Sequence, residues 1–369
     1  MIQKTRIGIV GCGSISTIYL KNTARFEALE VLAVADLDRS RAEAQAKAFD
    51  IPEVLSPKEL IEGDKVDVIL NLTIPAAHAE VALEALQNGK SVYNEKPLTV
   101  DRSAAEAMIE LAKKKGLRIG CAPDTFLGSA LQNARKLLDA GAIGTPVGAV
   151  AFLLCGGHES WHPNPFFLYQ TGGGPMFDMG PYYLTALTAL LGPVRRVTGS
   201  ARISLKQRPI GSGLHKGKVI DVEIPTHITG VLDFASGPVG TIITSFDVPG
   251  GHHLPNIEIY GTGGTMRIPD PNCFHGDILL SQAGQKEWNA IPSPFGYAEN
   301  SRGLGLADMS RAILSGRPHR ANGQAAFHVL DIMHAIHDAS EQGRHIELKT
   351  DMVRPDPLPE NLAFGEVPA

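Results

Sequence analysis

The first 120 residues alternate short β-branched runs with segments of helical periodicity, and this alternation constrains the fold more than any other feature of the chain. Apolar runs typical of strands lie at 7–10, 31–35, 66–72, 91–93 and 118–121. Between them, helical patterns cover 15–24, 39–49, 76–88 and 101–115. Strands joined by helical crossovers form a parallel sheet with right-handed connections. We therefore predict a doubly wound α/β domain over residues 1–124.

The pattern changes in the second part of the chain. Residues 226–234 and 240–248 alternate with a period of two, and 256–268 has the pattern of a hairpin. Two amphipathic helical patterns follow at 304–314 and 324–341. The length of 369 residues is typical of two domains. We predict a second, α+β domain over residues 125–369 with a large open, mainly antiparallel sheet.

Charge, cysteine usage and hydropathy exclude several classes of partner. The chain carries 34 Lys and Arg against 39 Asp and Glu, a formal net charge of −5, without long blocks of like charge. Nucleic acid is therefore not expected as a partner. The four cysteines are far apart and form no C-x-x-C pair, which is typical of a reducing compartment. Because no apolar run approaches a membrane span, we expect a cytoplasmic protein with no membrane partner.

Two glycines lie in the loop that joins the first strand to the first helix. Gly11 can make the tight turn there, and Gly13 can let backbone amides approach a pyrophosphate at the start of the helix. Ser16 stands at the third position of the motif, where a glycine is more usual. The loop predicts a dinucleotide-binding Rossmann domain. The residues expected to bind are Gly11, Cys12, Gly13, Ser14 and Ile15.

Asp36 follows the second strand and bears on which dinucleotide is bound. A carboxylate there can accept hydrogen bonds from the adenosine ribose hydroxyls and repel a 2′-phosphate, so NAD is predicted. Arg39 and Arg41 leave NADP open, since a nearby guanidinium could bind that phosphate. A charge at the start of the following helix is the alternative interpretation of Asp36.

Two further segments carry candidate chemistry. Lys96 lies in the sequence Glu95-Lys96-Pro97 at the carboxyl edge of the predicted sheet, where open α/β folds bind ligands. A lysine held in a dry crevice beside a carboxylate can exchange a proton with a hydroxyl or carbonyl group, whereas a surface lysine is the alternative. Asp178 and Tyr182 follow a glycine turn and lie four residues apart on one helix face. The alternative for this pair is a helix-start aspartate and a half-buried tyrosine.

Residues 158–162 spell H-E-x-x-H, which on a helix would place two imidazoles on zinc. Two glycines precede the motif and Pro163 follows it directly, so a helix that spans both histidines is hard to build. We therefore predict no metal site. Instead, His158, Trp161 and His162 are interpreted as a substrate loop suited to a carbohydrate, with an ordinary surface loop as the alternative.

Together these segments resemble the glucose-fructose oxidoreductase, inositol 2-dehydrogenase and MocA family. The likeness covers the glycine loop, residues 73–78, 95–97, 172–182 and the hairpin at 259–261. It implies that further residues bind the cofactor beside the glycine loop, Asp36 and Arg39, namely Thr73, Pro75, His78, Glu95 and Lys96. It also implies a homodimer or homotetramer formed through the sheet of the second domain.

The resemblance implies an NAD(P)-dependent oxidoreductase that transfers a hydride between nicotinamide and a secondary alcohol or ketone of a sugar, polyol or sugar derivative. Lys96 would be the principal proton acceptor, with Tyr182 hydrogen-bonded to the same oxygen and Asp178 orienting the substrate. Two alternatives stay open. One is a lyase or glycosidase that recycles its nicotinamide through a transient keto-sugar, and the other is a non-catalytic NAD-bound sensor.

Overall fold

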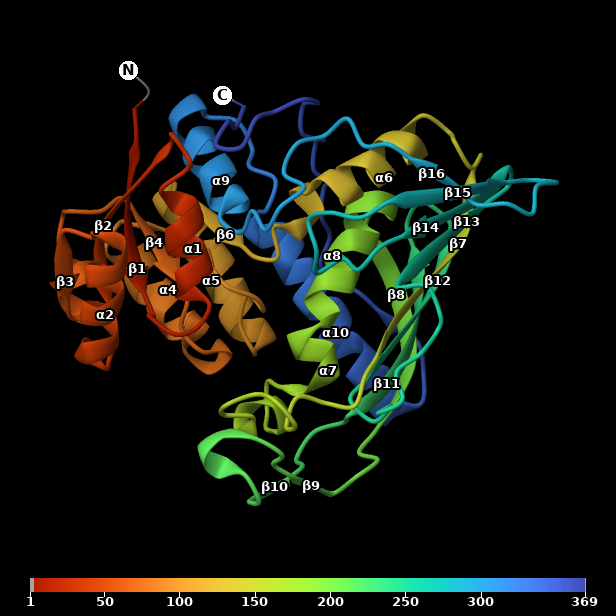
Figure 1. Cartoon of the computed structure of the whole chain (residues 1–369), viewed down its shortest axis with the longest axis horizontal. Coiled ribbons are helices and arrows are strands. Elements are labelled where there is room, and N and C mark those ends of the chain that lie inside the picture. Colours follow the sequence, from red (N-terminus) through yellow and green to blue (C-terminus); the bar gives the residue numbers. More distant parts are fainter. Residues whose placement is uncertain (1–2, 369) are drawn as a thin grey trace. The chain divides into compact units, whose positions relative to one another are not determined.

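The computed structural model describes residues 3–368, which form two compact units (Figure 1). The first unit contains the chain up to Gln132, then Pro294–Phe327 and the residues from Pro355 onward. The second unit contains Asn133–Ser293 and His328–Arg354. Within the described residues, no helix is both long and apolar enough to cross a membrane.

The first unit is built on a six-stranded parallel sheet with the order β3-β2-β1-β4-β5-β6. The strands are β1 (Thr5–Val10), β2 (Leu29–Ala35), β3 (Glu53–Leu55), β4 (Val68–Asn71), β5 (Ser91–Asn94) and β6 (Ile119–Cys121). The crossover helices are α1 (Ser16–Thr23), α2 (Arg39–Phe49), α3 (Pro57–Glu62), α4 (His78–Gln87) and α5 (Arg102–Lys115). This confirms the doubly wound sheet. Since the strand order reverses between β1 and β4, ligands are expected at the carboxyl ends of these strands.

Sequence analysis did not predict β3 and α3. The strand has only three residues, all half-buried, so it lacks the apolar run that marks the central strands. The helix begins with a capping box, in which the Ser56 hydroxyl accepts from the Glu59 amide at 3.2 Å and the Glu59 carboxylate accepts from the Ser56 amide at 2.9 Å. That pairing defines the start of a helix too short to show periodicity.

A helix from the C-terminal part of the chain completes the first unit. It is α9 (Leu304–Ser315), and the amides of Gly303 and Gly305 at its start donate to Asp124 Oδ2 at 2.9 and 3.0 Å. Burial raises the pKa of Asp124 to about 6, although these two hydrogen bonds and the charge of Arg302 oppose the shift. The side chain that anchors α9 is therefore a strongly perturbed carboxyl group.

The second unit is built on a nine-stranded sheet with the order β16-β15-β14-β13-β7-β12-β11-β8-β17. Its strands are β7 (Pro146–Leu154), β8 (Val194–Arg202), β11 (His227–Phe234), β12 (Val239–Ser245), β13 (Ile257–Gly261), β14 (Gly264–Ile268), β15 (Ile278–Gln282), β16 (Asn289–Ile291) and β17 (Ile346–Glu347). Only the β7–β12 pair is parallel, while the other neighbours are antiparallel. This confirms the predicted large, mainly antiparallel sheet.

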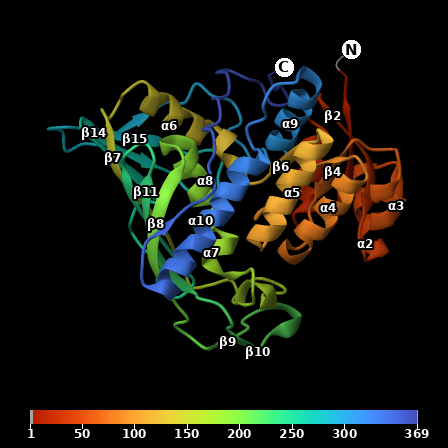
Figure 2. The ribbon, with the colours of Figure 1, turned by 180° about the vertical axis from the view of Figure 1, so that it is seen from behind.

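Helices pack on one face of the nine-stranded sheet, as Figures 1 and 2 show. These helices are α6 (Ser129–Asp139), α7 (Gly174–Asp178), α8 (Gly180–Leu191) and α10 (Gly323–Gln342). Ile336 of α10 lies over Gly199 and Gly230, which pair across β8 and β11, and a Cβ at either glycine would come within 2.8 Å of it. Every second side chain of β11 points to the opposite face of the sheet and is not buried in this core. Val231, for example, is only half-buried.

A small hairpin departs from the nine-stranded sheet between β8 and β11. It consists of β9 (Gln207–Pro209) and β10 (Val219–Asp221), which pair in antiparallel fashion. Apolar side chains in and beside the hairpin form a separate small core with two from the segment before α7 and one that follows β12. They are Leu168, Tyr169, Ile210, Ile220, Val222 and Phe246. Sequence analysis did not predict this hairpin, which packs against the loop that carries the H-E-x-x-H sequence.

Candidate active site

The glycine loop has the geometry that its sequence predicted. Gly11 has a φ of +102°, and a Cβ there would lie 2.6 Å from the carbonyl carbon of Leu72, so only glycine fits. In contrast, a Cβ at Gly13 would have no atom within 4 Å, so the backbone there faces open space. The hydroxyl of the buried Ser16 donates to the Gly13 carbonyl at 2.6 Å and closes the loop onto α1. The cradle therefore fits a pyrophosphate that approaches Gly13.

Asp36 is fixed directly beside this loop. Its Oδ2 accepts from the amide of Cys12 at 2.7 Å, and its Oδ1 accepts from the amide of Asp38 at 2.9 Å. Both carboxylate oxygens are thus oriented by backbone groups, with lone pairs left for further donors. The Cys12 side chain points into the core, where burial raises the pKa of its thiol to about 12. Cys12 therefore contributes its backbone amide to the loop rather than a reactive thiol.

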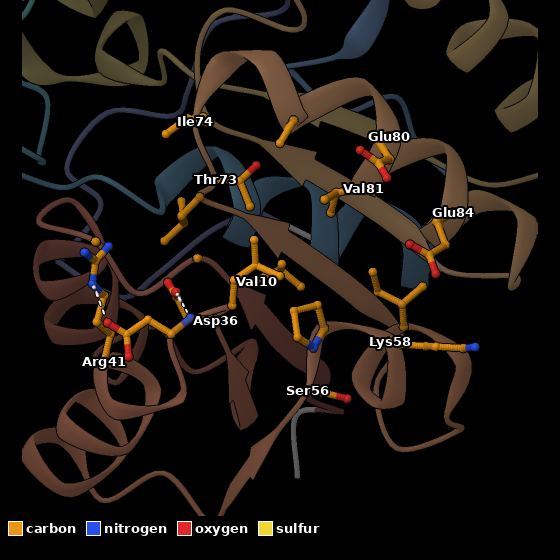
Figure 3. A pocket seen from close by; sticks show the side chains of 18 residues that line it. Val10, Asp36, Arg41, Ser56, Lys58, Thr73, Ile74, Glu80, Val81 and Glu84 are labelled. Carbon is orange, nitrogen blue, oxygen red and sulfur yellow. Dashed lines mark hydrogen bonds and ion pairs between the residues drawn. The ribbon is translucent and has the colours of Figure 1, made fainter. Parts of the chain in front are cut away.

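A cavity of about 640 Å³ lies at the carboxyl ends of β1, β2 and β4 (Figure 3). Gly11, Gly13, Asp36 and Thr73, four of the residues predicted to bind a cofactor, are among the residues that line it. The other lining residues are Val10, Leu37, Asp38, Arg41, Ser56, Pro57, Lys58, Ile61, Leu72, Ile74, Ala77, Glu80, Val81 and Glu84. Figure 3 places Arg41 at one end of the cavity and Lys58 with Glu84 at the other. Its glycine cradle, apolar wall and oriented carboxylate fit the adenosine and pyrophosphate of a dinucleotide.

The other predicted cofactor residues have different surroundings. The guanidinium of Arg39 lies 2.9 Å from Glu43 on the surface of α2, whereas Arg41 faces the cavity and pairs with Asp38 at 3.4 Å. Ser14 is exposed, Ile15 precedes the first turn of α1, and Pro75 begins a short 3₁₀ turn at Pro75–Ala77.

The Lys96 loop is held by the side chains of the two residues that precede the lysine. Glu95 is 8% exposed and uses Oε2 to accept from the Lys96 amide at 2.9 Å and Oε1 to accept from the Tyr19 hydroxyl at 2.8 Å. Asn94 donates through its side-chain amide to the Leu98 carbonyl at 2.9 Å. Lys96 itself is half-buried, and the bond to Pro97 is cis. The backbone that carries the lysine is therefore fixed by neutral and carboxylate groups of the same unit.

His78 holds the Lys96 loop from the other side. Its Nδ1 lies 2.7 Å from the Pro97 carbonyl and its Nε2 lies 3.1 Å from the Thr73 carbonyl. The ring is 1% exposed, and burial lowers the pKa of His78, with the two carbonyls opposing that shift. With both ring nitrogens on backbone carbonyls, His78 connects the cavity wall at Thr73 to the lysine loop.

The second unit brings His158 and Asp178 together. Asp178 ends α7, and its Oδ2 lies 3.2 Å from Nε2 of His158. Gly173 precedes α7 and Gly174 begins it, and the chain passes very close to its neighbours at both positions. A Cβ at Gly173 would lie 2.3 Å from the Phe167 carbonyl oxygen. Tyr182 lies in the first turn of α8 and is 6% exposed, in agreement with the buried position that a helix of this apolar character requires.

The H-E-x-x-H segment forms one hydrogen-bonded turn. The amide of His162 donates to the carbonyl of His158 at 2.8 Å, and Nδ1 of His162 accepts from the Asn164 amide at 3.1 Å. Glu159 forms an ion pair with Arg208 at 2.6 Å, so its carboxylate does not lie between the histidines. Across residues 3–368, no three or more Asp, Glu, His or Cys side chains are grouped to hold a metal ion. Trp161 is 61% exposed beside His158.

Two family models match the chain, one in each of its units. Residues 5–122 match the model of an oxidoreductase family with an NAD-binding Rossmann fold. Residues 131–267 match the model of the GFO/IDH/MocA C-terminal domain.

Curated relatives and solved structures are similar over most of the chain. A scyllo-inositol 2-dehydrogenase (NAD(+)) of Bacillus subtilis is 26% identical over 79% of this chain and 81% of its own. A trans-1,2-dihydrobenzene-1,2-diol dehydrogenase of Bos taurus is 28% identical over 82% of this chain and 85% of its own. A levoglucosan dehydrogenase solved with NADH and levoglucosan has a TM-score of 0.79 at 20% identity, over 95% of this chain and all (100%) of the other. At that identity, the structural likeness shows the fold.

Proposed function

The chain belongs to the GFO/IDH/MocA family of oxidoreductases, and from this premise we propose that it is an NAD(P)-dependent dehydrogenase of a sugar, polyol or sugar derivative. The observation that carries the proposal is the open cradle at Gly13, which lies with Asp36 on the cavity of the first unit. Relatives named as inositol and xylose dehydrogenases support the substrate class.

The first unit supplies the groups that would hold the cofactor. The Gly13 backbone and the start of α1 would face the pyrophosphate, and the Asp36 carboxylate would accept from the ribose hydroxyls. When bound, the nicotinamide accepts or returns the hydride. We favour NAD over NADP because Asp36 would repel a 2′-phosphate and because Arg41 already pairs with Asp38.

Lys96 is our candidate for the proton acceptor. Oxidation of a secondary alcohol requires removal of the hydroxyl proton as the hydride leaves the adjoining carbon, and a well-placed acid-base group contributes ~10²–10⁴-fold to the rate. The hydrogen bonds of Glu95 and His78 fix the backbone on both sides of the lysine, which limits where its ammonium group can reach. Such fixed placement is what catalysis by position requires.

The second unit supplies our candidates for substrate contacts. Asp178 would orient hydroxyl groups and Tyr182 would hydrogen-bond the reacting oxygen. The exposed Trp161, with His158 and His162 beside it, offers an aromatic face and ring nitrogens that suit a carbohydrate.

A substrate screen combined with one substitution tests the proposal. Sugars, polyols and glycosides would be incubated with NAD and with NADP, and reduced cofactor and sugar products would be measured separately. We expect Lys96→Met to lower turnover by ~10³-fold, while NAD affinity in a calorimetric titration stays within a factor of ~3. Wild-type turnover by this variant would refute the assignment of Lys96. Product formed without net NADH would favour the lyase or glycosidase alternative, and NAD binding without any turnover would favour the sensor.

We also propose a homo-oligomer, a dimer or tetramer, formed through the face of the nine-stranded sheet on which helices do not pack in Figures 1 and 2. Val150, Phe152, Val231 and Ile243 are half-buried there on neighbouring strands. Pairing of two copies would cover these apolar side chains. The free thiols of Cys12, Cys121 and Cys155 support a reducing, cytoplasmic location. Light scattering would measure the oligomeric state, and a monomer at micromolar concentration would contradict this proposal.

A further inference from the structure

A cluster of buried charges lies in the second unit beside the H-E-x-x-H turn. Arg208 of β9 is 2% exposed, and its Nη1 lies 2.6 Å from Glu159 Oε1. Its Nη2 donates to the Phe246 carbonyl at 2.9 Å and forms an ion pair with Asp247. The Tyr169 hydroxyl donates to the other oxygen of Glu159. One arginine from the small hairpin therefore joins two carboxylates that are distant in sequence.

Stability alone does not account for this cluster. Removing charges from water costs several kcal/mol per ion, and apolar residues of similar volume often stabilise a protein as well or better. The hairpin already has an apolar core that includes Ile210 and Ile220. A buried ion pair differs from apolar packing in that it fixes the relative orientation of its partners. A guanidinium donates its hydrogen bonds in one plane, so its acceptors must lie in that plane.

The oriented ion pair between Glu159 and Arg208 fixes the backbone between Cys155 and Glu159. A Cβ at Gly157 would lie 2.4 Å from Glu159 Oε2 and 2.8 Å from Arg208 Nη1, so the backbone at Gly157 packs directly on the ion pair. The Cys155 amide donates to the Ser245 carbonyl at 3.0 Å, and the Glu159 carbonyl accepts from the Gly211 amide at 2.9 Å. The turn is thus tied to β12 at one end and to the hairpin at the other.

His158 lies between these two ties and faces Asp178. While Glu159 is drawn to Arg208, the neighbouring imidazole places Nε2 3.2 Å from Asp178 Oδ2. Its ring packs against Phe246 with centroids 4.6 Å apart and against Trp161 at 5.0 Å. Two aromatic neighbours and a fixed backbone restrict the ring, so we expect its contact to Asp178 to depend on the ion pair one residue away.

We propose that Arg208 and His158 are positioning residues, with Arg208 acting through Glu159 to fix the turn so that His158 holds the Asp178 carboxylate in the orientation used for substrate. This inference rests on the proposed function, in which Asp178 contacts substrate. It gives the H-E-x-x-H sequence a role that involves no metal. It also assigns the β9–β10 hairpin to the site, although the hairpin carries none of the predicted catalytic residues.

Two substitutions of His158 separate its hydrogen bond from its packing. His158→Phe keeps a ring between Phe246 and Trp161 but removes the donor, so we expect kcat to fall by ~10–100-fold with little change in NAD affinity. His158→Gln places an amide nitrogen near the position of Nε2, and we expect it to recover at least ~5-fold of that loss. Equal activity of the two variants, or wild-type kcat in His158→Phe, would overturn the proposal.

Arg208→Lys tests the positioning step, because an ammonium keeps the charge and loses the fork. We expect kcat to fall by ~10-fold or more with NAD affinity unchanged, and Glu159→Gln to produce a smaller fall. Arg267→Lys is the matched control, since Arg267 pairs with Glu258 at 2.6 Å in the same unit and far from Asp178 in sequence. Wild-type kcat in both Arg208→Lys and Glu159→Gln would refute the positioning role.

An activity-independent measurement distinguishes failure of this inference from failure of the proposed function. We would record the ¹⁵N resonance of the His158 imidazole by NMR in the wild type and the variants. We expect Asp178→Asn and Arg208→Lys to move this resonance and Arg267→Lys to leave it in place. An unmoved resonance in Arg208→Lys would overturn the inference even if no sugar is turned over. A moved resonance without turnover would count against the proposed function alone.

Discussion

The two units hold their candidate functional side chains by different means. In the first unit, hydrogen bonds to backbone groups orient the site, as when the amide of Cys12 donates to Asp36 and the amide of Lys96 donates to Glu95. In the second unit, a buried cation orients the turn that carries His158, and its partners are 49 and 39 residues away in sequence. The first arrangement distributes its restraints over many weak contacts, whereas the second concentrates them on Arg208.

The sharpest test of this difference is the loss of that single cation. Arg208→Met would leave the largely buried carboxylates of Glu159 and Asp247, 12% and 8% exposed, without their partner, and removing one member of a buried ion pair costs about 3–5 kcal/mol. We therefore expect the free energy of unfolding, measured by denaturant titration, to fall by about that amount.

Arg267→Met is the control for charge removal in the same unit. Arg267 is 41% exposed, so its pair with Glu258 is screened by solvent, and its loss should cost less than about 1 kcal/mol. Similar losses for the two variants would mean that the buried cluster does not concentrate the restraint.

Buried titratable groups give a second contrast between the units, with opposite signs. In the first unit, burial raises the pKa of Asp124 to about 6, so the folded state binds a proton more readily than the unfolded state. Acidification from pH 7.5 to 4.5 should therefore stabilise the wild type relative to Asp124→Asn by about 2 kcal/mol. Denaturant titrations of both proteins at the two pH values measure this difference, and an unchanged difference would contradict the raised pKa.

His337 of the second unit should behave in the opposite way. Burial and the neighbouring His334 lower the pKa of His337 to about 4, so its neutral form favours the folded state and protonation favours the unfolded state. Between pH 7.5 and 4.5 the wild type should lose about 2 kcal/mol relative to His337→Gln. Denaturant titrations of both proteins at the two pH values measure this loss. If the wild type gained stability on acidification, the ring would be stabilised as a cation.

The glycine loop offers a matched pair of substitutions within the first unit. Gly11→Ala forces a side chain into a φ of +102° and against the Leu72 backbone, which should cost about 1–3 kcal/mol of stability. Gly13→Ala meets no atom within 4 Å, so stability should stay within about 0.5 kcal/mol while NAD affinity falls by at least ~10-fold. Thermal unfolding with and without NAD separates the two effects. Equal destabilisation by both variants would mean that Gly13 is required by the fold rather than by a ligand.

The parts of the site that sequence analysis predicted are those whose contacts are local or repeat along the chain. Gly11, Gly13 and Asp36 follow buried strands, so their place at the sheet edge comes from strand-helix alternation alone. Which arginine of α2 faces the cavity depends on the helix beginning after Asp38, because Arg41 then lies one turn from Asp38 and Arg39 one turn from Glu43. The arginine that faces the cavity could not be predicted from the sequence pattern.

Arg208 could not be predicted because nothing local marks it. The strands β9 and β10 have three residues each, too few to show alternation, and the partners of Arg208 come from a turn and from the segment that follows β12. Likewise, Lys58 and Glu84 reach the cavity from α3 and α4 through tertiary packing. The H-E-x-x-H sequence was visible, but the role of Glu159 depends on a residue 49 positions away.

The smallest effect concerns the choice between the two nicotinamide cofactors. Asp36→Asn keeps one carbonyl oxygen for the Cys12 or Asp38 amide and removes the charge that faces a ribose, so NAD affinity should fall by ~10-fold, about 1.4 kcal/mol. Without that charge a 2′-phosphate is no longer repelled, so the ratio of NAD to NADP affinity should fall further than NAD affinity alone.

Asp38→Asn is the matched control, because it releases Arg41 from its 3.4 Å pair and leaves the carboxylate of Asp36 in place. It should raise NADP affinity by less than ~5-fold and leave NAD affinity unchanged. If Asp38→Asn shifted the ratio more than Asp36→Asn, cofactor choice would depend on the freed guanidinium, and the first unit too would concentrate its selectivity on one cation.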